Sequence, residues 1–441
     1  MDRWDLEQAR TAFLARDAAA LESILQTAFP VDSEYPRIPE WVRYLLGQGA
    51  APIADEAEDQ QLAQSLARTA AYLTSPRPKH PAPRGLSGAN LEFIADKPGS
   101  PGWSLMFFLN HLALSQVKPR RRTAVVGTLR NDGIYILEWI AHYRALGFEH
   151  LFLYTNDNSD GSDALLSLLA EHGIITLIEN QLGEKADPEP KAFGHAIHLL
   201  QETRDFEWLL FIDSDEYLVP APLYKNNINQ MISALEKAYP DGKTAAICYD
   251  WRWYVSDMAL TRTPGLLSER FEHARPHWLT KTMARLPDLM SMRCQHHPEV
   301  RPGYRVVDSN FQPIDMTQIW QRKTPVYEGG QMNHYWPKSF EEFVVKKARG
   351  ASLTLQTNIF DRPYDKFFLW NERHTPNNYY PPDPNLIAAV HTEIAALRAL
   401  SGIAEVADKI DQNFSQFVAK ITDTRQLSDL YSEHLCEPGP L

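Results

Sequence analysis

The sequence predicts an α/β protein with a mainly parallel sheet, a helical N-terminal extension and C-terminal helices. Two observations lead to this prediction. Between residues 123 and 212, short apolar runs rich in β-branched residues alternate with segments whose apolar residues recur at helical spacing. Residues 1–75 and 386–422 show helical spacing without such runs. Strands that alternate with single helices form βαβ crossovers, which produce a parallel sheet covered on both faces.

The N-terminal extension is expected to span residues 1–118. Its helices are predicted at residues 6–15, 18–28, 41–47 and 59–72, and a proline-rich linker follows near residues 75–83. The α/β domain is predicted to span residues 119–355. Residues 356–441 would then hold a long loop rich in Pro, Asn and Tyr and two helices, at 386–400 and 403–422.

Within the α/β domain, four buried strands are predicted at residues 123–129, 150–155, 174–178 and 208–212. Helices are predicted between them at residues 134–146, 162–172 and 190–202. After this half the pattern is less regular, with strands expected at 244–253 and within 327–336, and with loops and short elements from 255 to 320. Ser339 and Glu342 form a capping box that begins a helix, which Gly350 can end.

The composition narrows the class of protein. The net charge is −12 and the isoelectric point is about 5.7, which argues against broad nucleic-acid binding because that needs a basic face. Hydrophobic residues make up 44% of the chain, which is enough for a large core. The three cysteines, Cys248, Cys294 and Cys436, lie far apart, so we expect neither a disulfide framework nor a zinc ribbon. This usage fits a reducing cytoplasm.

No apolar run approaches the roughly 18–20 residues that a membrane-spanning helix requires. The nearest candidate is residues 103–114, which we interpret as a buried helix, with an interfacial helix that docks on a membrane as the alternative. We therefore expect a cytoplasmic protein without a transmembrane segment. Peripheral association with the inner face of a membrane is the accompanying hypothesis.

Polar residues follow three of the predicted strands. Arg130, Asn131 and Asp132 come after the first, residues 156–160 after the second, and residues 213–216 after the fourth. In open α/β sheets, ligands bind beyond the carboxyl ends of the strands. Because these three ends belong to one alternating unit, the sequence predicts a binding site where they meet.

Asp213 and Asp215 are the strongest candidates for chemistry at that edge. Two carboxylates one residue apart, on a turn that leaves a buried strand, can address one Mg²⁺ or Mn²⁺ ion. Such an ion withdraws charge from a departing diphosphate. If the pair stood alone, a solvated turn or a helix cap would be the simpler interpretation. Its position directly after a buried strand favours a metal-binding role instead. An EF-hand is excluded because the loop lacks the required Gly and distal Glu.

The motifs of this region resemble those of glycosyltransferase family 2 and family 92-like proteins, which have the GT-A fold. The motifs lie in one order at compatible spacings: Arg130-Asn131-Asp132-Gly133, Leu137-Glu138-Trp139-Ile140-Ala141-His142-Tyr143, Leu146-Gly147, Asn156-Asp157, Asp160-Gly161 and Phe211-Ile212-Asp213-Ser214-Asp215-Glu216-Tyr217. A weaker resemblance, which includes Lys281 and residues 333–339, continues to about residue 350. The family resemblance implies a nucleoside-diphosphate-sugar donor. Asp213 would contact the ribose and the metal ion, and Asp215 would also bind the metal ion.

The resemblance also implies that a downstream histidine completes the metal site. We choose His334, because it follows a strand-like segment and precedes a capped helix, with His296 and His297 as alternatives. His195 and His198 share a helix face, and such pairs are usually structural.

The same resemblance predicts contacts with the donor at the first strand end, where Arg130, Asn131 and Asp132 would face the nucleotide. Asp157 would touch the base or ribose. Lys191 either pairs with the diphosphate or is a surface residue. Residues 251–254, Trp-Arg-Trp-Tyr, either stack on a sugar or bury both tryptophans in the core.

The predicted reaction is metal-dependent transfer of a sugar to a hydroxyl of a glycan or glycolipid, with inversion implied by the resemblance, as in polysaccharide biosynthesis. An inverting transferase needs a carboxylate that accepts the hydroxyl proton. Asp257 and Glu269 are our candidates, and Asp250 is a third. The alternatives are a metal-dependent nucleotidyltransferase or phosphohydrolase, and a non-catalytic carbohydrate-binding subunit of the same fold.

Overall fold

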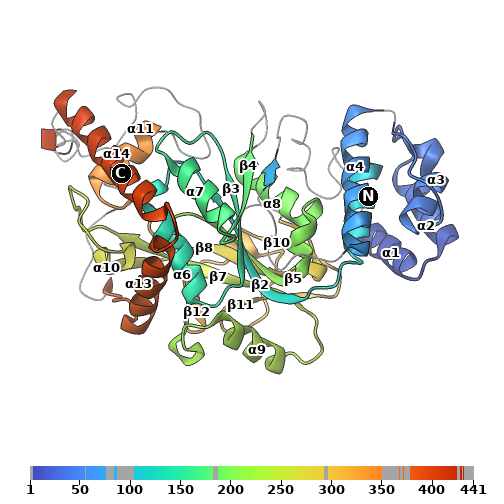
Figure 1. The fold of residues 1–441 in the computed structure, drawn as a ribbon. Coiled ribbons are helices and arrows are strands. Elements are labelled where there is room, and N and C mark those ends of the chain that lie inside the picture. The colour runs from blue at the N-terminus through green and yellow to red at the C-terminus, as the bar shows by residue number, and fades with distance from the viewer. Residues whose placement is uncertain are drawn as a thin grey trace.

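The computed structural model describes residues 3–54, 56–75, 84–86, 104–181, 187–292, 296–349, 367, 371, 378–424, 428–429 and 431. Helices α1 (Arg3–Leu14), α2 (Ala18–Ala28), α3 (Ile38–Leu45), α4 (Ala57–Thr74) and α5 (Leu105–Leu114) lie together at one end of the molecule, and the C-terminal helices lie at the other (Figure 1). The predicted N-terminal helices are therefore confirmed to within a few residues. The proline-rich segment at 76–83 lies outside the described residues.

A ten-stranded mixed sheet forms the centre of the molecule, in the order β1-β4-β3-β2-β5-β8-β7-β12-β6, with β11 also paired to β7. Its parallel half consists of β2 (Arg121–Leu129), β3 (His150–Thr155), β4 (Thr176–Asn180) and β5 (Phe206–Asp213), joined by α6 (Ile136–Ala145), α7 (Ser162–Glu171) and α8 (Pro188–His198). The short strand β1 (Arg84–Leu86) pairs with β4. The α/β class, the four strands and the crossovers are as the sequence predicts.

The other half of the sheet is mostly antiparallel. It contains β6 (Glu216–Pro220), β7 (Thr244–Val255), β8 (His273–Arg285), β11 (Arg305–Asp308) and β12 (Gly330–His334). A small second sheet pairs β9 (Leu289–Met292) with β10 (Pro298–Val300). The expectation of only loops and short elements between residues 255 and 320 is wrong, because β8 is a 13-residue strand that joins β5 to β7.

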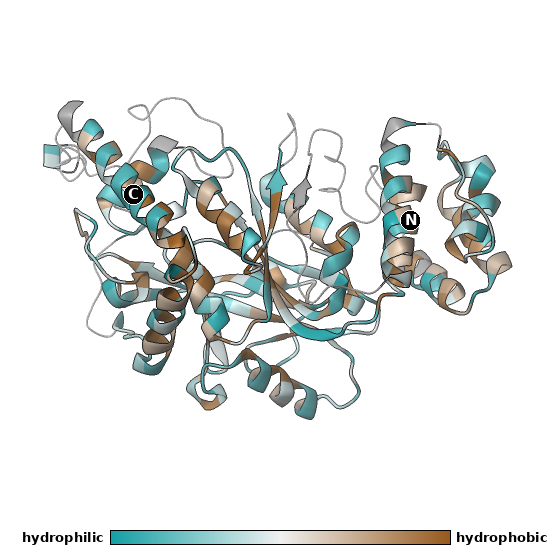
Figure 2. Cartoon of the chain, in the orientation of Figure 1, coloured by the Kyte–Doolittle hydropathy of each residue, from teal (hydrophilic) through white to brown (hydrophobic). Residues whose placement is uncertain are grey.

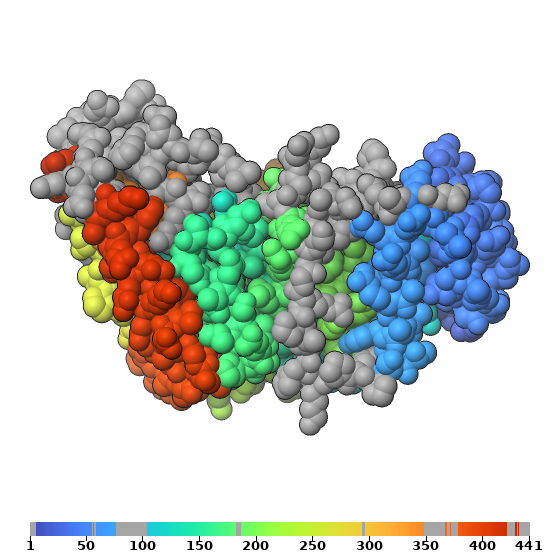
Figure 3. Space-filling model, turned by 45° about the horizontal axis from the view of Figure 1, so that its top comes forward, coloured from blue at the N-terminus to red at the C-terminus, as the bar shows by residue number. Residues whose placement is uncertain are grey.

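Helices cover both faces of the sheet, and each face has its own apolar core. One core packs α6, α7, α9 (Ile228–Ala238), α13 (Pro384–Arg398) and α14 (Ile403–Thr424) on the sheet. The opposite face is covered by α8. Hydrophobic residues are coloured brown along the central strands and on parts of the helices that pack on them (Figure 2), and α13 and α14 lie along the flank of the molecule (Figure 3). This burial is the main driving force for the layered arrangement.

The N-terminal helices have a separate apolar core, which includes Leu199 and Met290 from the sheet domain. Every residue of α5 is buried, which supports the interpretation of this segment as a buried helix. The contact with the sheet domain also has a polar part, in which Arg301 pairs with Glu7. His111 of α5 lies 3.1 Å from His198 of α8, between their Nδ1 atoms. The extension is thus docked firmly against the domain.

Among the described residues, no single helix is both long and apolar enough to cross a membrane. Helices α13 and α14 pass that test only as a pair, which is bent by 106°.

A glycine in β2 shows how tightly the parallel half is packed. A Cβ atom at Gly127 would lie 2.7 Å from the ring of Trp139 and 3.1 Å from Leu153. The indole of Trp139 in turn donates to the carbonyl oxygens of Asp213 and Glu216, at 3.1 Å each. Gly127 is therefore required for α6 to lie close enough to hold the turn that follows β5.

We expect Gly127→Ala to lower the free energy of unfolding by about 1–3 kcal/mol, because the added methyl group must displace a buried indole. Chemical denaturation, followed by tryptophan fluorescence, measures the change. Gly49→Ala is the matched control, since its Cβ would meet nothing nearer than 3.7 Å, and it should change stability by less than about 0.5 kcal/mol. Equal stability of Gly127→Ala and the wild type would contradict this account of the packing.

Candidate functional site

The loops that follow β2, β3 and β5 meet at one edge of the sheet because these strands are parallel and in register. Thr128 lies opposite Asp213, and Leu129 lies opposite Thr155. Asn131 has a positive φ of 57° and accepts a hydrogen bond from the backbone N–H of Ser159 through its side chain. The hydroxyl of Ser214 donates to Asp132. The predicted convergence of the three polar strand ends is therefore found in the structure.

Side chains of α6 fix the turn between β5 and β6. Besides the two bonds from Trp139, the hydroxyl of Tyr143 donates to the carbonyl oxygen of Glu216 at 2.8 Å. The backbone N–H of Asp213 donates to the side chain of Glu216 at 3.0 Å. Hydrogen bonds from α6 and within the turn thus hold the segment that carries Asp213 and Asp215, and they set the direction of both carboxylates.

Asp213 is bound to a buried lysine. The Nζ atom of Lys281, on β8, lies 2.7 Å from Oδ2 of Asp213 and 3.4 Å from Oε2 of Glu216. Burial opposes the charged form of Lys281, but Asp213, Glu216 and Glu189 outweigh it and raise its pKa. Oδ1 of Asp213 accepts a hydrogen bond from Thr128. Both oxygens of Asp213 therefore have partners within the protein.

A third acid, Glu189 of α8, completes this group. Burial, together with the nearby charge of Asp213, raises the pKa of Glu189. Burial also raises the pKa of Glu216 well above its ordinary value. Protonation of these two groups reduces the negative charge that one ammonium group must balance.

Asp215 has different partners. Its Oδ1 atom lies 3.4 Å from Nε2 of His334, at the end of β12, and its Oδ2 atom lies 2.6 Å from Nζ of Lys346. Burial opposes ionisation, but Lys346 and His334 outweigh it and hold the pKa of Asp215 well below its ordinary value. Lys346 belongs to α11 (Phe340–Arg349), and its side chain is 28% exposed. This carboxylate is thus ionised and lies beside a lysine that can reach solvent.

Helix α11 is anchored where it begins. The predicted capping box is confirmed, because Ser339 and Glu342 exchange bonds of 3.0 and 3.3 Å with each other's backbone N–H groups. Glu342 also binds the guanidinium of Arg270 and the hydroxyl of Tyr135, all of them buried. Lys338, just before the helix, has its pKa lowered by burial and by Lys346. The anchored helix start positions two lysines at the acidic pair.

The donor set at Asp215 and His334 fits a divalent cation that is held mainly by its substrate. Among the described residues there is no group of three or more His, Cys, Asp or Glu side chains arranged to hold a metal ion. Mg²⁺ is commonly held by one or two carboxylates together with substrate phosphates and waters, and Mn²⁺ also prefers carboxylate and water oxygens, so the carboxylate of Asp215 carries most of this fit. The Nδ1 atom of His334 has no hydrogen-bond partner within the described structure. The lysine on Asp213 is fully buried, whereas the lysine on Asp215 is partly exposed and can be displaced, so Asp215 and His334 are the better-placed ligands.

The two tryptophans of β7 pack against His334. The ring centroid of His334 lies 4.2 Å from that of Trp251 and 4.9 Å from that of Trp253. Both tryptophans are buried, with 7% and 6% of their surface exposed. The register of β7 against β8 shifts at Trp251, because this one residue of β7 faces three residues of β8, 277–279. The tryptophans therefore form the buried wall of the site.

The other residues predicted to contact the donor lie in different surroundings. Asp157 lies beyond β3 with a positive φ of 46° and accepts a hydrogen bond from Asn156, close to the other loops. Arg130 directly follows β2. Lys191 is fully buried in α8, and its ammonium donates to the carbonyl oxygen of Gln181. The surface alternative for Lys191 is therefore wrong, and its contact with the donor stays a prediction.

The other histidine candidates make structural contacts. His296 lies 2.9 Å from the carbonyl oxygen of Thr280 through Nδ1, and His297 packs against the ring of Trp320. On α8, His195 lies 2.8 Å from the hydroxyl of Tyr154 through Nδ1, and His198 contacts His111.

The candidate bases lie in different surroundings. Asp257 follows β7, has a positive φ of 51°, and lies 2.6 Å from Nδ1 of His273. Glu269 caps α10 (Leu267–Arg270) by accepting from the N–H of Leu266, and lies 3.1 Å from His391 of α13. Asp250 forms a buried pair with Arg322. No described contact joins any of the three to the acidic pair, so the identity of the base stays a prediction.

Three groups that surround the acidic pair have no role in the sequence-based prediction. Lys281 is contributed by a strand that the sequence pattern does not reveal. Lys346 stands seven residues after Ser339, and positions seven apart share a helix face, so the capping box gives a usable signal. Glu189 is found only through its contact with Asp213.

We expect Lys281→Met to lower the free energy of unfolding by about 3–5 kcal/mol, because it leaves the buried Glu216 and the partly buried Asp213 without their cation. Arg398→Met is the matched control. It breaks an exposed pair with Asp408, which should contribute no more than about 1 kcal/mol. Urea denaturation of the two variants measures the difference, and equal losses would show that Lys281 is not the charge that balances this cluster.

Comparisons with known proteins agree with the resemblance noted in the sequence. A family model described as glycosyltransferase family 92 matches residues 130–358, just over half of the chain. A glycosyltransferase family 92 protein of Oryza sativa subsp. japonica is 28% identical over 90 residues, and one of Ricinus communis is 28% identical over 89. Each match covers 20% of this chain and 15% of the relative.

Among solved structures, S. aureus TarS residues 1–349 matches with 11% identity and a TM-score of 0.27, over 69% of this chain and 92% of that one. The same fragment in complex with UDP matches with a TM-score of 0.26 and equal coverage. At these TM-scores the similarity assigns nothing to individual residues. The residues of the acidic site, from Arg130 to Lys346, all fall within the segment matched by the family model, and the chain belongs to glycosyltransferase family 92.

Proposed function

We propose that this chain transfers a sugar from a nucleoside-diphosphate-sugar donor to a hydroxyl of a glycan or glycolipid, with the help of Mn²⁺ or Mg²⁺. The observation that carries this proposal is the ionised Asp215 beside His334 and Lys346, at the edge where three polar strand ends meet. Membership of the glycosyltransferase family supports the reaction class. The donor diphosphate would lie over this edge.

A divalent cation bound here would neutralise the diphosphate as it leaves. Asp215 and His334 would hold the ion, and Asp213 would stay bound to Lys281 and keep the turn in place. Lys346 has an exposed portion, and its release from Asp215 would place an ammonium group near the phosphates. Lys338, whose pKa is lowered, adds a second cationic group on the same side. Fixed charges of this kind stabilise the charge that develops on the leaving group.

Of the two predicted bases, Asp257 is the better supported. It follows β7, the strand whose tryptophans contact His334, whereas Glu269 is occupied by the cap of α10. An inverting reaction would use this carboxylate to accept the proton of the acceptor hydroxyl. The imidazole of His273 orients it through the 2.6 Å contact.

We expect Asp215→Asn to weaken Mn²⁺-dependent binding of the donor nucleotide by at least about tenfold, because one anionic ligand of the ion is lost. A thermal-shift panel of UDP-, GDP- and dTDP-sugars, with and without Mn²⁺, identifies the nucleotide, and calorimetric titration measures the affinity. Asp241→Asn, which alters an exposed pair with Arg305, is the control and should bind as the wild type does.

The same panel separates the competing functions. If no donor gives a metal-dependent shift, the proposed site is wrong. If the protein releases phosphate or pyrophosphate instead of a nucleoside diphosphate, the chain is a phosphohydrolase or nucleotidyltransferase. Metal-dependent binding without any turnover would favour a non-catalytic subunit.

We expect Asp257→Asn to lower kcat by a factor on the order of 10²–10⁴ with little change in donor affinity, since a general base acts in the transition state. Glu269→Gln should keep kcat within a few-fold and lose about 1 kcal/mol of stability as a weakened helix cap. Release of the nucleoside diphosphate, with oligosaccharide acceptors and the donor found above, measures both. The reverse pattern would assign the base to Glu269.

A further inference from the structure

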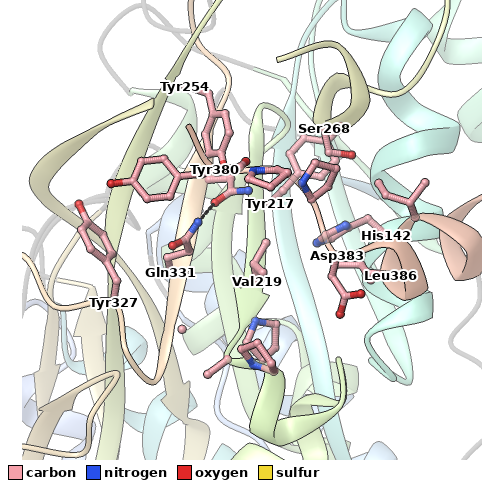
Figure 4. Close-up of a pocket in the computed structure, with 18 of the residues that line it drawn as sticks. His142, Tyr217, Val219, Tyr254, Ser268, Tyr327, Gln331, Tyr380, Asp383 and Leu386 are labelled. Carbon is pink, nitrogen blue, oxygen red and sulfur yellow. Dashed lines mark hydrogen bonds between the residues drawn. The ribbon is translucent and has the colours of Figure 1, made fainter. Parts of the chain in front are cut away.

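A cavity of about 430 Å³ lies beside β6 and β12, and the site described above does not use it. Its volume falls within the range of about 300–1,000 Å³ that small-molecule sites occupy. Figure 4 shows Tyr254, Tyr327 and Gln331 on one side of it, and His142, Asp383 and Leu386 on the other. Tyr254, Gln331, His142 and Leu386 come from β7, β12, α6 and α13, whereas Tyr327 lies in the loop before β12 and Asp383 is the N-cap of α13.

The cavity and the acidic pair lie on opposite faces of the same strands. On β12, His334 lies opposite Glu216 and faces Asp215. Asn333 lies opposite Tyr217, and Gln331 lies opposite Val219, and these four residues line the cavity. Because successive side chains of a strand point to opposite faces, a ligand in the cavity cannot occupy the donor site.

Tyrosine rings form much of the cavity wall, from Tyr254, Tyr327, Tyr379 and Tyr380. Two of the rings are fixed by Arg252, whose guanidinium lies 3.9 Å from the ring centroid of Tyr327 and 3.7 Å from that of Tyr380. Held rings present flat apolar faces without losing further conformational entropy when a ligand binds.

Side-chain amides add hydrogen-bonding groups of fixed orientation. Nε of Arg252 donates to Gln331 at 2.7 Å, Gln331 donates to Asn333 at 2.6 Å, and Asn333 donates to the hydroxyl of Tyr335 at 3.3 Å. Both amides also form hydrogen bonds with the hydroxyl of Tyr254, which oppose the rise that burial causes in its pKa. The hydroxyl of Tyr217, which is buried, has no hydrogen-bond partner within the described structure.

The charge of the lining disfavours anionic ligands. The described residues that line the cavity include the carboxylates Glu328 and Asp383 and no Lys or Arg, although Arg252 contacts two of the lining tyrosines from outside the lining. Backbone hydrogen bonds lower the pKa of Glu328, and the amide of Asn226 lowers that of Asp383, so both are ionised at neutral pH. A nucleotide or an acidic sugar would be repelled here, whereas a neutral ligand would not.

We propose that this cavity is a second carbohydrate site, which binds a neutral saccharide through the tyrosine faces and the Gln331–Asn333 amides. A neutral sugar has apolar C–H faces and a rim of hydroxyl groups, and the cavity offers a matching set of rings and amides. The proposal goes beyond the transfer reaction and does not depend on it, since the two sites share strands but no side chains.

Saturation-transfer NMR of the full chain tests the proposal. The probes are neutral tetrasaccharides of glucose, mannose, galactose and N-acetylglucosamine, with a galacturonate tetrasaccharide and UMP as anionic counterparts. At least one neutral tetrasaccharide should bind in a saturable way, and the anionic galacturonate should not compete with it. Tyr379→Ala should weaken that binding by about tenfold, while Tyr379→Phe, which keeps the ring, should stay within about threefold. Tyr379 is 48% exposed, so these variants keep the core intact.

Gln331→Leu is a second variant that removes the amide at similar size, and it should also weaken binding. Tyr35→Ala, at an exposed tyrosine of the N-terminal helices, is the control and should have no effect. Asp215→Asn should leave saccharide binding unchanged, which separates a failure of this proposal from a failure of the proposed reaction. The proposal is overturned if no neutral tetrasaccharide binds, if the galacturonate competes, or if Tyr379→Ala and Gln331→Leu both bind as the wild type does.

Discussion

The buried ammonium group of Lys281 joins three strands at the edge where the polar strand ends meet. It comes from β8 and contacts Asp213 at the end of β5 and Glu216 at the start of β6. With Glu189 beside them, these acids lie in a medium of low dielectric, where burial raises the pKa of both glutamates and a negative charge needs a nearby cation. Lys281 supplies that cation and thereby fixes the turn that carries Asp215. The position of the proposed metal ligand thus depends on a residue outside the acidic motif.

The parallel half of the sheet could be predicted because each of its strands is a local apolar run. The segment from Trp208 to Ile212 is an example, since it is buried on both faces. Strand β8 could not be predicted in this way. Its sequence, from His273 to Arg285, mixes charged, aromatic and apolar residues without alternation, because one end is partly exposed and the other crosses the buried site. Only pairing with β5 and β7 makes it a strand, and such long-range pairing leaves no local pattern.

The candidate site was predictable to a similar degree. Asp215 and His334 lie at ends of neighbouring strands, and a polar residue that ends an apolar strand is visible in the sequence. What the pattern could not show is that Asp213 and Asp215 have different partners, Lys281 and Lys346. That division depends on the register of β5 with β8 and on the direction of α11, and both are properties of the packed structure.

Strand β7 serves two sites, which has a consequence for how the protein can change over time. Its alternate side chains occupy opposite faces, with Trp251 and Trp253 against His334, and with Tyr254 at the cavity. Insertion or deletion of a single residue in this strand would exchange the two sets, and so would disturb the tryptophan wall beside His334 and the tyrosine-lined cavity in one step. A substitution of one side chain, in contrast, can alter the tryptophan wall or the cavity separately. The length of β7 is therefore constrained by the sites on both faces of the sheet. Each side chain is constrained only by the face on which it lies.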